Sequence, residues 1–251
     1  MKPAPALLVE DDPFTRRAVA DFLQEEMDLQ VHQAASYEQA RAILDWLAPS
    51  CQLALVDVSL PRAQLDEAER RPWGLDLIQE IKTINARCGV VLWSAYTHFL
   101  PKVMELVAQG YRGLACIPKG VRAQMLREAV QRVLAGDVFL HRAVVRDERQ
   151  NLEALLLANL DPDVAQLVAD VAQRLEELTP RQKEVVSRIT RTPTAIAQEL
   201  GLEVRTVRNY QDAIYERLGL REPIPAIQHI RRDPIITLAL ILNHLKQADT
   251  S

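Results

Sequence analysis

Two apolar runs of this sequence end directly on carboxylates: Leu7-Leu8-Val9 leads into Glu10-Asp11-Asp12, and Leu53-Ala54-Leu55-Val56 leads into Asp57. Almost wholly apolar runs are typical of parallel strands covered on both faces of a sheet. In a doubly wound sheet the first and third strands are neighbours where the strand order reverses, and ligands bind beyond their carboxyl ends. Carboxylates crowded there repel each other, and a hard divalent cation removes that repulsion. The pattern therefore predicts a solvent-accessible Mg²⁺ site.

Short apolar runs and amphipathic helical patterns alternate through roughly the first 140 residues. We expect helices that begin near Phe14 and after Ser36, followed by three more downstream. This alternation predicts one doubly wound, flavodoxin-like α/β domain with a five-stranded parallel sheet over residues 1–138. The expected strands are residues 6–9, 29–32, 53–56, 90–93 and 114–117, and the three later helices are 75–84, 102–108 and 122–134.

Length and composition narrow the class of protein. The chain has 251 residues, enough for one or two domains, and is 48% hydrophobic and 25% charged. Its net charge of −4 excludes a uniformly basic nucleic-acid coat. The longest apolar run, 235–242, is too short to span a bilayer, and no signal-peptide core is present. Cys51, Cys88 and Cys116 are widely spaced, so we expect a reduced, cytoplasmic protein without structural disulfides or zinc.

The fourth and fifth strands add a hydroxyl and a cation to the same edge of the sheet, because they end at Ser94 and near Lys119. A carboxylate, a metal, a hydroxyl and an ammonium around one point make a phosphoryl-transfer site. Asp57 would be the nucleophile and form an acyl phosphate. Mg²⁺ and Lys119 would neutralise the phosphoryl oxygens, and Ser94 would hydrogen-bond one of them. The alternative is that acidic strand ends are merely the solvated starts of loops.

Over residues 5–138 the sequence resembles the response-regulator receiver family. The resemblance rests on residues 7–13 (Leu-Leu-Val-Glu-Asp-Asp-Pro), 55–61 (Leu-Val-Asp-Val-Ser-Leu-Pro), 91–95 (Val-Leu-Trp-Ser-Ala) and 117–119 (Ile-Pro-Lys). It implies that Asp57 is the phosphoacceptor, Ser94 the switch hydroxyl and Lys119 the family's lysine. It also implies a metal site in which Asp11 is favoured over Glu10 as the direct acidic ligand. The implied Mg²⁺ ligand set is Glu10, Asp11, Asp57 and the main-chain carbonyl of Ser59.

The sequence departs from this family pattern in three places. Cys116 stands where the family has an aromatic switch residue, so ring rotation cannot report phosphorylation, and its thiol is either an inert core group or a redox sensor. The loop after Pro61 is long, and its charged segment 64–71 is either a solvated excursion or a docking or lid segment. Pro118 precedes the family's lysine instead of following it.

We also expect Tyr96 to shield the acyl phosphate from water.

The second half of the chain has helical periodicity. Residues 139–177 form a linker that ends in an amphipathic helix. Residues 178–222 hold three short helices, and the first opens with a capping box of Thr179 and Gln182. Gly201 separates the second helix from the third. Helix, short glycine-containing turn and helix together are the helix-turn-helix pattern.

The local charge balance predicts that this helical region binds a polyanion. Residues 178–232 carry ten basic and six acidic side chains, a balance of +4 in a chain whose total is −4. A helix N-terminus attracts phosphate, while Arg and Asn side chains read base edges in the major groove. The first two turns of the third helix therefore predict a DNA-recognition face made by Arg205, Thr206, Arg208, Asn209 and Tyr210.

Residues 177–221 look like the LuxR/NarL-type effector domain. The resemblance implies double-stranded DNA as a partner and carries the contact pattern over to Arg208 and Asn209. Glu203 at the helix cap and Asp212 on the following turn depart from it, because a carboxylate facing DNA would repel it. The alternative is a protein-binding three-helix domain. The matching residues are Leu178-Thr179-Pro180-Arg181-Gln182-Lys183-Glu184-Val185, Ile196-Ala197, Leu200-Gly201-Leu202, Thr206-Val207-Arg208 and Leu218-Gly219-Leu220.

Residues 223–251 form a C-terminal extension with a helix that is apolar on nearly every side and therefore requires burial. It would pack on the effector domain, on the linker helix or on a second subunit, and a homodimer suits two DNA half-sites. The whole chain thus predicts a cytoplasmic transcription factor, not an enzyme, that receives a phosphoryl group from a sensor histidine kinase on Asp57. The alternatives are a receiver that acts without phosphorylation and an adaptor whose helical domain does not bind DNA.

Overall fold

The computed structural model describes residues 3–60, 73–94, 99–145, 149–221 and 232–247. The chain divides into two compact units, one of residues 1–106 and 111–147 and the other of residues 107–110 and 148–251. The domain boundaries inferred from the sequence stay predictions. Segment 64–71 and Tyr96 lie outside the described residues, and so do the roles expected for them. No described helix is long and apolar enough to cross a membrane.

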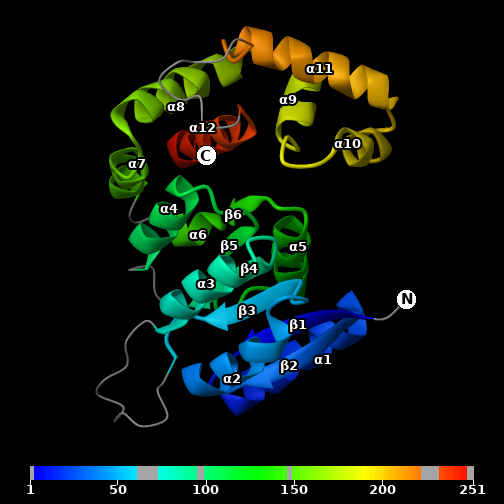
Figure 1. The fold of residues 1–251 in the computed structure, drawn as a ribbon, viewed down its shortest axis with the longest axis vertical. Helices are drawn as coiled ribbons and strands as arrows, with labels where there is room; N and C mark the ends of the chain where they lie inside the picture. Colours follow the sequence, from blue (N-terminus) through cyan, green and yellow to red (C-terminus); the bar gives the residue numbers. More distant parts are fainter. Residues whose placement is uncertain (1–2, 61–72, 95–98, 146–148, 222–231, 248–251) are drawn as a thin grey trace. The chain divides into compact units, whose positions relative to one another are not determined.

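The first unit is built on one parallel sheet with the strand order β2-β1-β3-β4-β5-β6 (Figure 1). The doubly wound α/β fold is confirmed, but the expectation of five strands is wrong by one. The added strand is β6 (Val138–Leu140), which pairs with β5 along the sheet edge. Its three residues are too few for periodicity to reveal. The expected strands are β1 (Ala4–Val9), β2 (Leu29–Ala34), β3 (Leu53–Asp57), β4 (Gly89–Ser94) and β5 (Leu114–Pro118).

Helices cover both faces of this sheet (Figure 1). On one face Leu23 of α1 and Val130 of α5 pack with Leu8, Leu55 and Val91 of the sheet in a single buried cluster. On the other face α2 and α3 pack side by side. The helices of this unit are α1 (Pro13–Met27), α2 (Tyr37–Leu47), α3 (Trp73–Ile84), α4 (Leu100–Ala108), α5 (Ala123–Leu134) and α6 (Arg142–Val145).

Strand register brings the predicted site residues to one edge of the sheet. Val9, the last residue of β1, pairs with Val56, so the chain leaves β1 at Glu10 level with Asp57. Asp57 in turn pairs with Trp93, and Ser94 pairs with Pro118. Because all of these strands are parallel, the carboxyl ends of β1, β3, β4 and β5 share this edge.

The second unit is all-helical. Thr179 and Gln182 form the predicted capping box at the start of α9, since each side chain accepts a hydrogen bond from the other residue's backbone N–H. Gly201 ends α10 in the left-handed conformation, with φ of 63°, and allows the tight turn into α11. The helices are α7 (Arg149–Ala158), α8 (Pro162–Arg174), α9 (Pro180–Val186), α10 (Pro193–Leu200), α11 (Val204–Arg217) and α12 (Arg232–Gln247).

The apolar C-terminal helix α12 packs on α8 and α7. Most of its apolar side chains are buried, and Asn243 Nδ2 donates to the Ala172 carbonyl of α8 at 2.8 Å. The expectation that these side chains pack on the linker helix is confirmed. Dimer formation through this helix stays a prediction. The buried residues are Ile235, Ile236, Leu238, Ala239, Ile241, Leu242 and Leu245.

Candidate functional site

Three carboxylates gather at the carboxyl edge of the sheet. Glu10, Asp11 and Asp57 each offer an oxygen, and these atoms lie within 4.8 Å of one another. Glu10 and Asp57 are buried, with 0% and 2% of their surface exposed, and Asp11 is half-buried. The sequence prediction that the ends of the first and third strands meet is confirmed.

Asp57 uses its two carboxylate oxygens differently. Oδ1 accepts a hydrogen bond of 3.0 Å from the backbone N–H of Ser59, which fixes the rotation of the carboxylate. Oδ2 accepts a hydrogen bond of 2.8 Å from Lys119 Nζ. Gly74, at the start of α3, lies directly against this residue, since a Cβ there would be 2.2 Å from the Asp57 carbonyl oxygen. Nothing in the sequence pattern around Gly74 indicates this close approach.

Lys119 reaches into the acidic cluster even though Pro118 precedes it. Its Nζ also donates to Glu10 Oε1 at 2.9 Å, and it lies 5.7 Å from the centre of the Trp93 ring. Its backbone N–H donates to the Ser94 carbonyl at 3.0 Å, which ties the residue to the end of β4. Burial disfavours the ammonium, but hydrogen bonds and charge from Asp57 and Glu10 outweigh burial and raise the pKa of Lys119.

Glu10 has the environment of a cation ligand. Burial raises the pKa of its carboxyl group, and Lys119 offsets part of that rise. Glu10 Oε2 is buried and receives no hydrogen bond from the described residues, although Lys119 Nζ lies at an ion-pair distance of 2.9 Å. A buried carboxylate oxygen with only the Lys119 ammonium beside it, next to two further carboxylates, fits a hard divalent cation such as Mg²⁺.

Ser94 and Ser59 lie where the sequence analysis expects them. Ser94 is the last residue of β4 and is 3% exposed, and Ser59 follows Asp57 by two residues and is half-buried. Cys116 lies inside β5 with 0% of its surface exposed. Burial raises the pKa of its thiol well above the ordinary value, so the thiolate that oxidation requires is disfavoured. The structure favours an inert core thiol over a redox sensor at this position.

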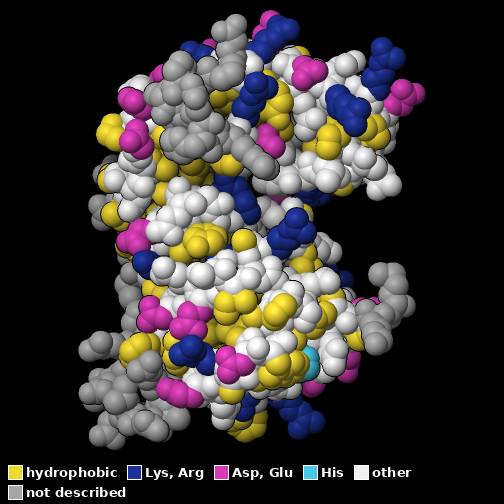
Figure 2. Space-filling model, in the orientation of Figure 1, with side chains coloured by type: hydrophobic (Ala, Val, Ile, Leu, Met, Phe, Trp, Pro, Cys, Tyr) yellow, Lys and Arg dark blue, Asp and Glu magenta, His cyan; other side chains and the backbone are white. Residues whose placement is uncertain are grey.

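The residues predicted to contact DNA lie on the first turns of α11, and their exposure differs. Val207 and Ile214 point into the helical unit and are fully buried. Arg205, Arg208 and Asn209 are exposed, and neither arginine forms an ion pair with a described residue. Asp212 is exposed at the spacing that places it on the same face, while Thr206 and Tyr210 are half-buried. Figure 2 shows basic side chains interspersed with acidic ones around this helix.

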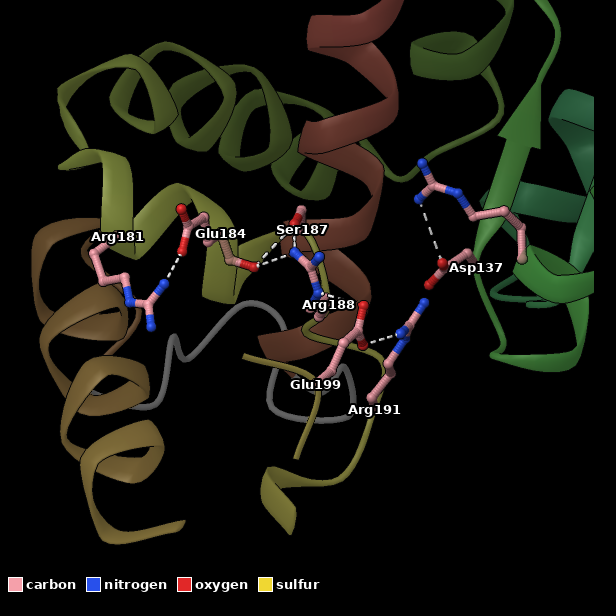
Figure 3. Close-up of polar contacts among 8 residues, drawn as sticks. Asp137, Arg181, Glu184, Ser187, Arg188, Arg191 and Glu199 are labelled. Carbon is pink, nitrogen blue, oxygen red and sulfur yellow. Dashed lines mark hydrogen bonds and ion pairs between the residues drawn. The ribbon is translucent and has the colours of Figure 1, made fainter. Parts of the chain in front are cut away.

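The arginines of α9 and of the turn that follows it are engaged within the unit (Figure 3). Glu199 of α10 accepts a hydrogen bond of 2.9 Å from Arg188 Nε and a further one from Arg191. The hydrogen bond from Arg188 is the main reason that the pKa of Glu199 is lowered. Arg181 pairs with Glu184 and also donates to the Leu200 carbonyl at 3.1 Å. These contacts fix α9 against α10.

Fold and site together define a receiver-type α/β protein with an appended helical region. The family model described as "Response regulator receiver domain" matches residues 6–131, half of the chain. The chain therefore belongs to the response regulator receiver family, and the predicted resemblance is confirmed. A search among curated proteins found no match.

The solved structures to which the chain is similar include a receiver domain protein and response regulators. A CheY-like receiver domain protein from Methanospirillum hungatei JF-1 is 20% identical, with a TM-score of 0.42, and the match covers 53% of this chain and 94% of that one. A LuxR family DNA-binding response regulator from Silicibacter pomeroyi is 24% identical, with a TM-score of 0.42 and coverages of 56% and 98%. The response regulator RcsB, in a complex with DNA, is 14% identical, with a TM-score of 0.42 and coverages of 96% and 98%.

Proposed function

We propose that this chain is a transcriptional response regulator that is switched by phosphorylation of Asp57 and binds double-stranded DNA through α11. The observation that carries the proposal is the contact of Lys119 Nζ with both Asp57 and Glu10 at the edge where four strands end. A cation beside two buried carboxylates is an arrangement suited to neutralising a transferred phosphoryl group.

Each residue of the site has a separate task in this proposal. The Ser59 N–H holds the Asp57 carboxylate. An Asp57 oxygen attacks the phosphorus of a phosphohistidine on a sensor kinase, and the N–P bond breaks to release the kinase imidazole. Lys119 and the Ser94 hydroxyl bind the oxygens of the resulting acyl phosphate. Glu10, Asp11, Asp57 and the Ser59 carbonyl would hold Mg²⁺, which supplies charge neutralisation. The protein is consumed as a phosphoryl acceptor, so we do not class it as an enzyme.

DNA binding by α11 would follow from Arg205 and Arg208, which form no ion pair with a described residue. Arg205 and Arg208 are available for phosphates and base edges, and Asn209 beside them can read adenine. Two such helices in a homodimer would address two half-sites. The acyl phosphate would favour the dimer only if it binds one receiver conformation more tightly than the other.

The phosphorylation step is tested by intact mass after incubation with Mg²⁺ and acetyl phosphate. We expect one added phosphate on the wild type and none on Asp57→Asn, because the asparagine amide cannot attack phosphorus to form the acyl phosphate proposed at this position. Asp45→Asn, which removes an exposed carboxylate of α2, should be phosphorylated like the wild type. Phosphate on Asp57→Asn would contradict the assignment of Asp57 as the phosphoacceptor. Light scattering of the same samples measures whether phosphorylation changes dimerisation.

The DNA interface is tested by the anisotropy of a labelled mixed-sequence duplex over a range of salt concentrations. Arg208→Ala should weaken binding by about 10-fold or more and reduce the salt slope by about one. Asp212→Asn should strengthen binding, because it removes a negative charge from the same face. Arg17→Ala changes the net charge equally on an exposed site of α1 and should leave binding unchanged. Binding that is absent or insensitive to salt would favour the adaptor alternative.

A second candidate function is that of a receiver that regulates without phosphorylation. It is favoured by Cys116, which offers no aromatic ring to move, and by Lys119, which already bonds both carboxylates. In that case Asp57→Asn would assemble and bind DNA like the phosphorylated wild type. A difference between those two samples would support the phosphorylation switch.

A further inference from the structure

Two cysteines that are distant in the sequence meet at the edge of the sheet where the strands begin. Cys51 and Cys88 lie on the segments that lead into β3 and β4, which are neighbouring parallel strands. They are 37 residues apart in the chain, yet their Sγ atoms are 3.7 Å apart. Both side chains are buried, with exposures of 1% and 0%. The two sulfurs are therefore in van der Waals contact, with no other group between them.

The end of α3 holds both cysteine backbones in place. Asn85 Nδ2 donates to the Cys51 carbonyl at 3.0 Å, and the Cys88 N–H donates to the Asn85 carbonyl at 3.0 Å. Lys82 Nζ donates to the Cys88 carbonyl at 2.5 Å, which places a cation beside this cysteine. The residues at the end of this helix thus position the two cysteines against each other, and bond formation requires the sulfurs to approach from 3.7 Å to about 2 Å in disulfide geometry.

We propose that Cys51 and Cys88 are a redox pair that closes to a disulfide when the protein is exposed to hydrogen peroxide. The overall change is oxidation of two thiols by one peroxide, which yields one disulfide and two waters. This site is independent of the proposed phosphorylation function, because it lies at the start of β3 and β4 and Asp57 and Ser94 lie at their ends.

The structure indicates which sulfur reacts first. The hydrogen bond between the two thiols lowers the pKa of Cys51 and raises that of Cys88. Cys51 also follows the exposed turn residues Pro49 and Ser50, whose local opening gives peroxide access to the sulfur. The Cys51 thiolate attacks one peroxide oxygen and breaks the O–O bond, and the departing hydroxide takes up the thiol proton as water.

Closure follows from the sulfenic acid on Cys51. The Cys88 sulfur attacks the Cys51 sulfur, the S–O bond breaks, and the second water leaves with the Cys88 proton. The new bond ties together the starts of two central strands and closes a loop that contains β3 and Asp57. Closing a loop of this length restricts the unfolded chain, so the oxidised protein should unfold at a higher temperature.

The test treats the native full-length protein with hydrogen peroxide, then denatures it and alkylates the remaining thiols. Wild type should lose the mass of two hydrogens, keep one alkylatable thiol at Cys116, and yield a cross-linked peptide joining Cys51 to Cys88. The matched control Cys116→Ala should form the same link, and Cys51→Ser should not. The melting temperature of the oxidised wild type should rise by about 5–10 °C and return when dithiothreitol is added.

Two results would overturn the proposal. One is a product in which single cysteines carry added oxygen without any link between residues 51 and 88. The other is an unchanged or lower melting temperature in the linked protein, which would show that the bond does not stabilise this part of the sheet. The peptide map of the wild type decides the first point even if Cys51→Ser does not fold.

Discussion

Lys119→Met is expected to lower the free energy of unfolding by about 3 kcal/mol in the absence of divalent cations. Lys119 Nζ lies 2.8 Å from Asp57 Oδ2 and 2.9 Å from Glu10 Oε1, and both carboxylates are buried. Removing the ammonium leaves two neighbouring carboxylates without a counter-ion in a site of low dielectric constant. Methionine keeps the length of the side chain, so the loss reports mainly on charge.

Mg²⁺ should compensate for much of this loss. A ligand that binds only the folded state stabilises it by a term that grows with its concentration relative to Kd. Without Lys119 the carboxylates have no competing cation, so Mg²⁺ should stabilise the variant more than the wild type. Urea unfolding with and without Mg²⁺ measures both effects.

The matched control for this prediction is Lys102→Met. Lys102 forms an ion pair of 2.7 Å with Glu105 on α4, but its side chain is 35% exposed and solvent screens the pair. We expect a change within about 0.5 kcal/mol and no added response to Mg²⁺. A variant at Lys119 that is as stable as the wild type without Mg²⁺, or that gains no more from Mg²⁺, would argue against a charge-balanced metal site.

The sheet and the acidic cluster could be predicted because buried strands have a recognisable apolar sequence. A parallel strand covered on both faces is an apolar run, and the carboxylates that end two such runs are brought together by strand order alone. The register that places Asp57 opposite Trp93 and Ser94 opposite Pro118 is seen in the structure, and strand order alone does not determine it. The start of a helix can also be predicted where the capping residues are close in sequence, as they are for Thr179.

Features that depend on tertiary packing could not be predicted in this way. Cys51 and Cys88 are separated by a strand and a helix, and nothing in their spacing indicates that their sulfurs meet. Gly74 is required because its Cα lies against the Asp57 backbone, a contact between two elements. Lys82, at the end of an amphipathic helix, has the pattern of a solvated lysine and is instead 1% exposed.

Lys82 gives the second large expected effect. Its Nζ donates to the carbonyls of Cys88, Arg112 and Gly113, which connect the end of α3 to the segments before β4 and β5. Among the described residues no carboxylate pairs with this ammonium. Lys82→Met keeps the aliphatic volume but removes all three donors. The Gly113 carbonyl keeps a hydrogen bond from the Val90 N–H, so the substitution affects the carbonyls of Cys88 and Arg112 most. We expect a loss of about 2–4 kcal/mol at pH 7.

The pH dependence of this loss separates the buried charge from simple packing. Burial lowers the pKa of Lys82 from 10.5 to about 8 in the folded protein, so the unfolded chain binds more protons between these values. The wild type should therefore gain stability as the pH rises from about 8 to 10.5, while Lys82→Met lacks this titration. Urea unfolding under reducing conditions at pH 7 and pH 10 should show a wider gap at the higher pH. A gap that stays constant or narrows would mean that the ammonium is not destabilised by its burial, and that the three carbonyls solvate it as well as water does.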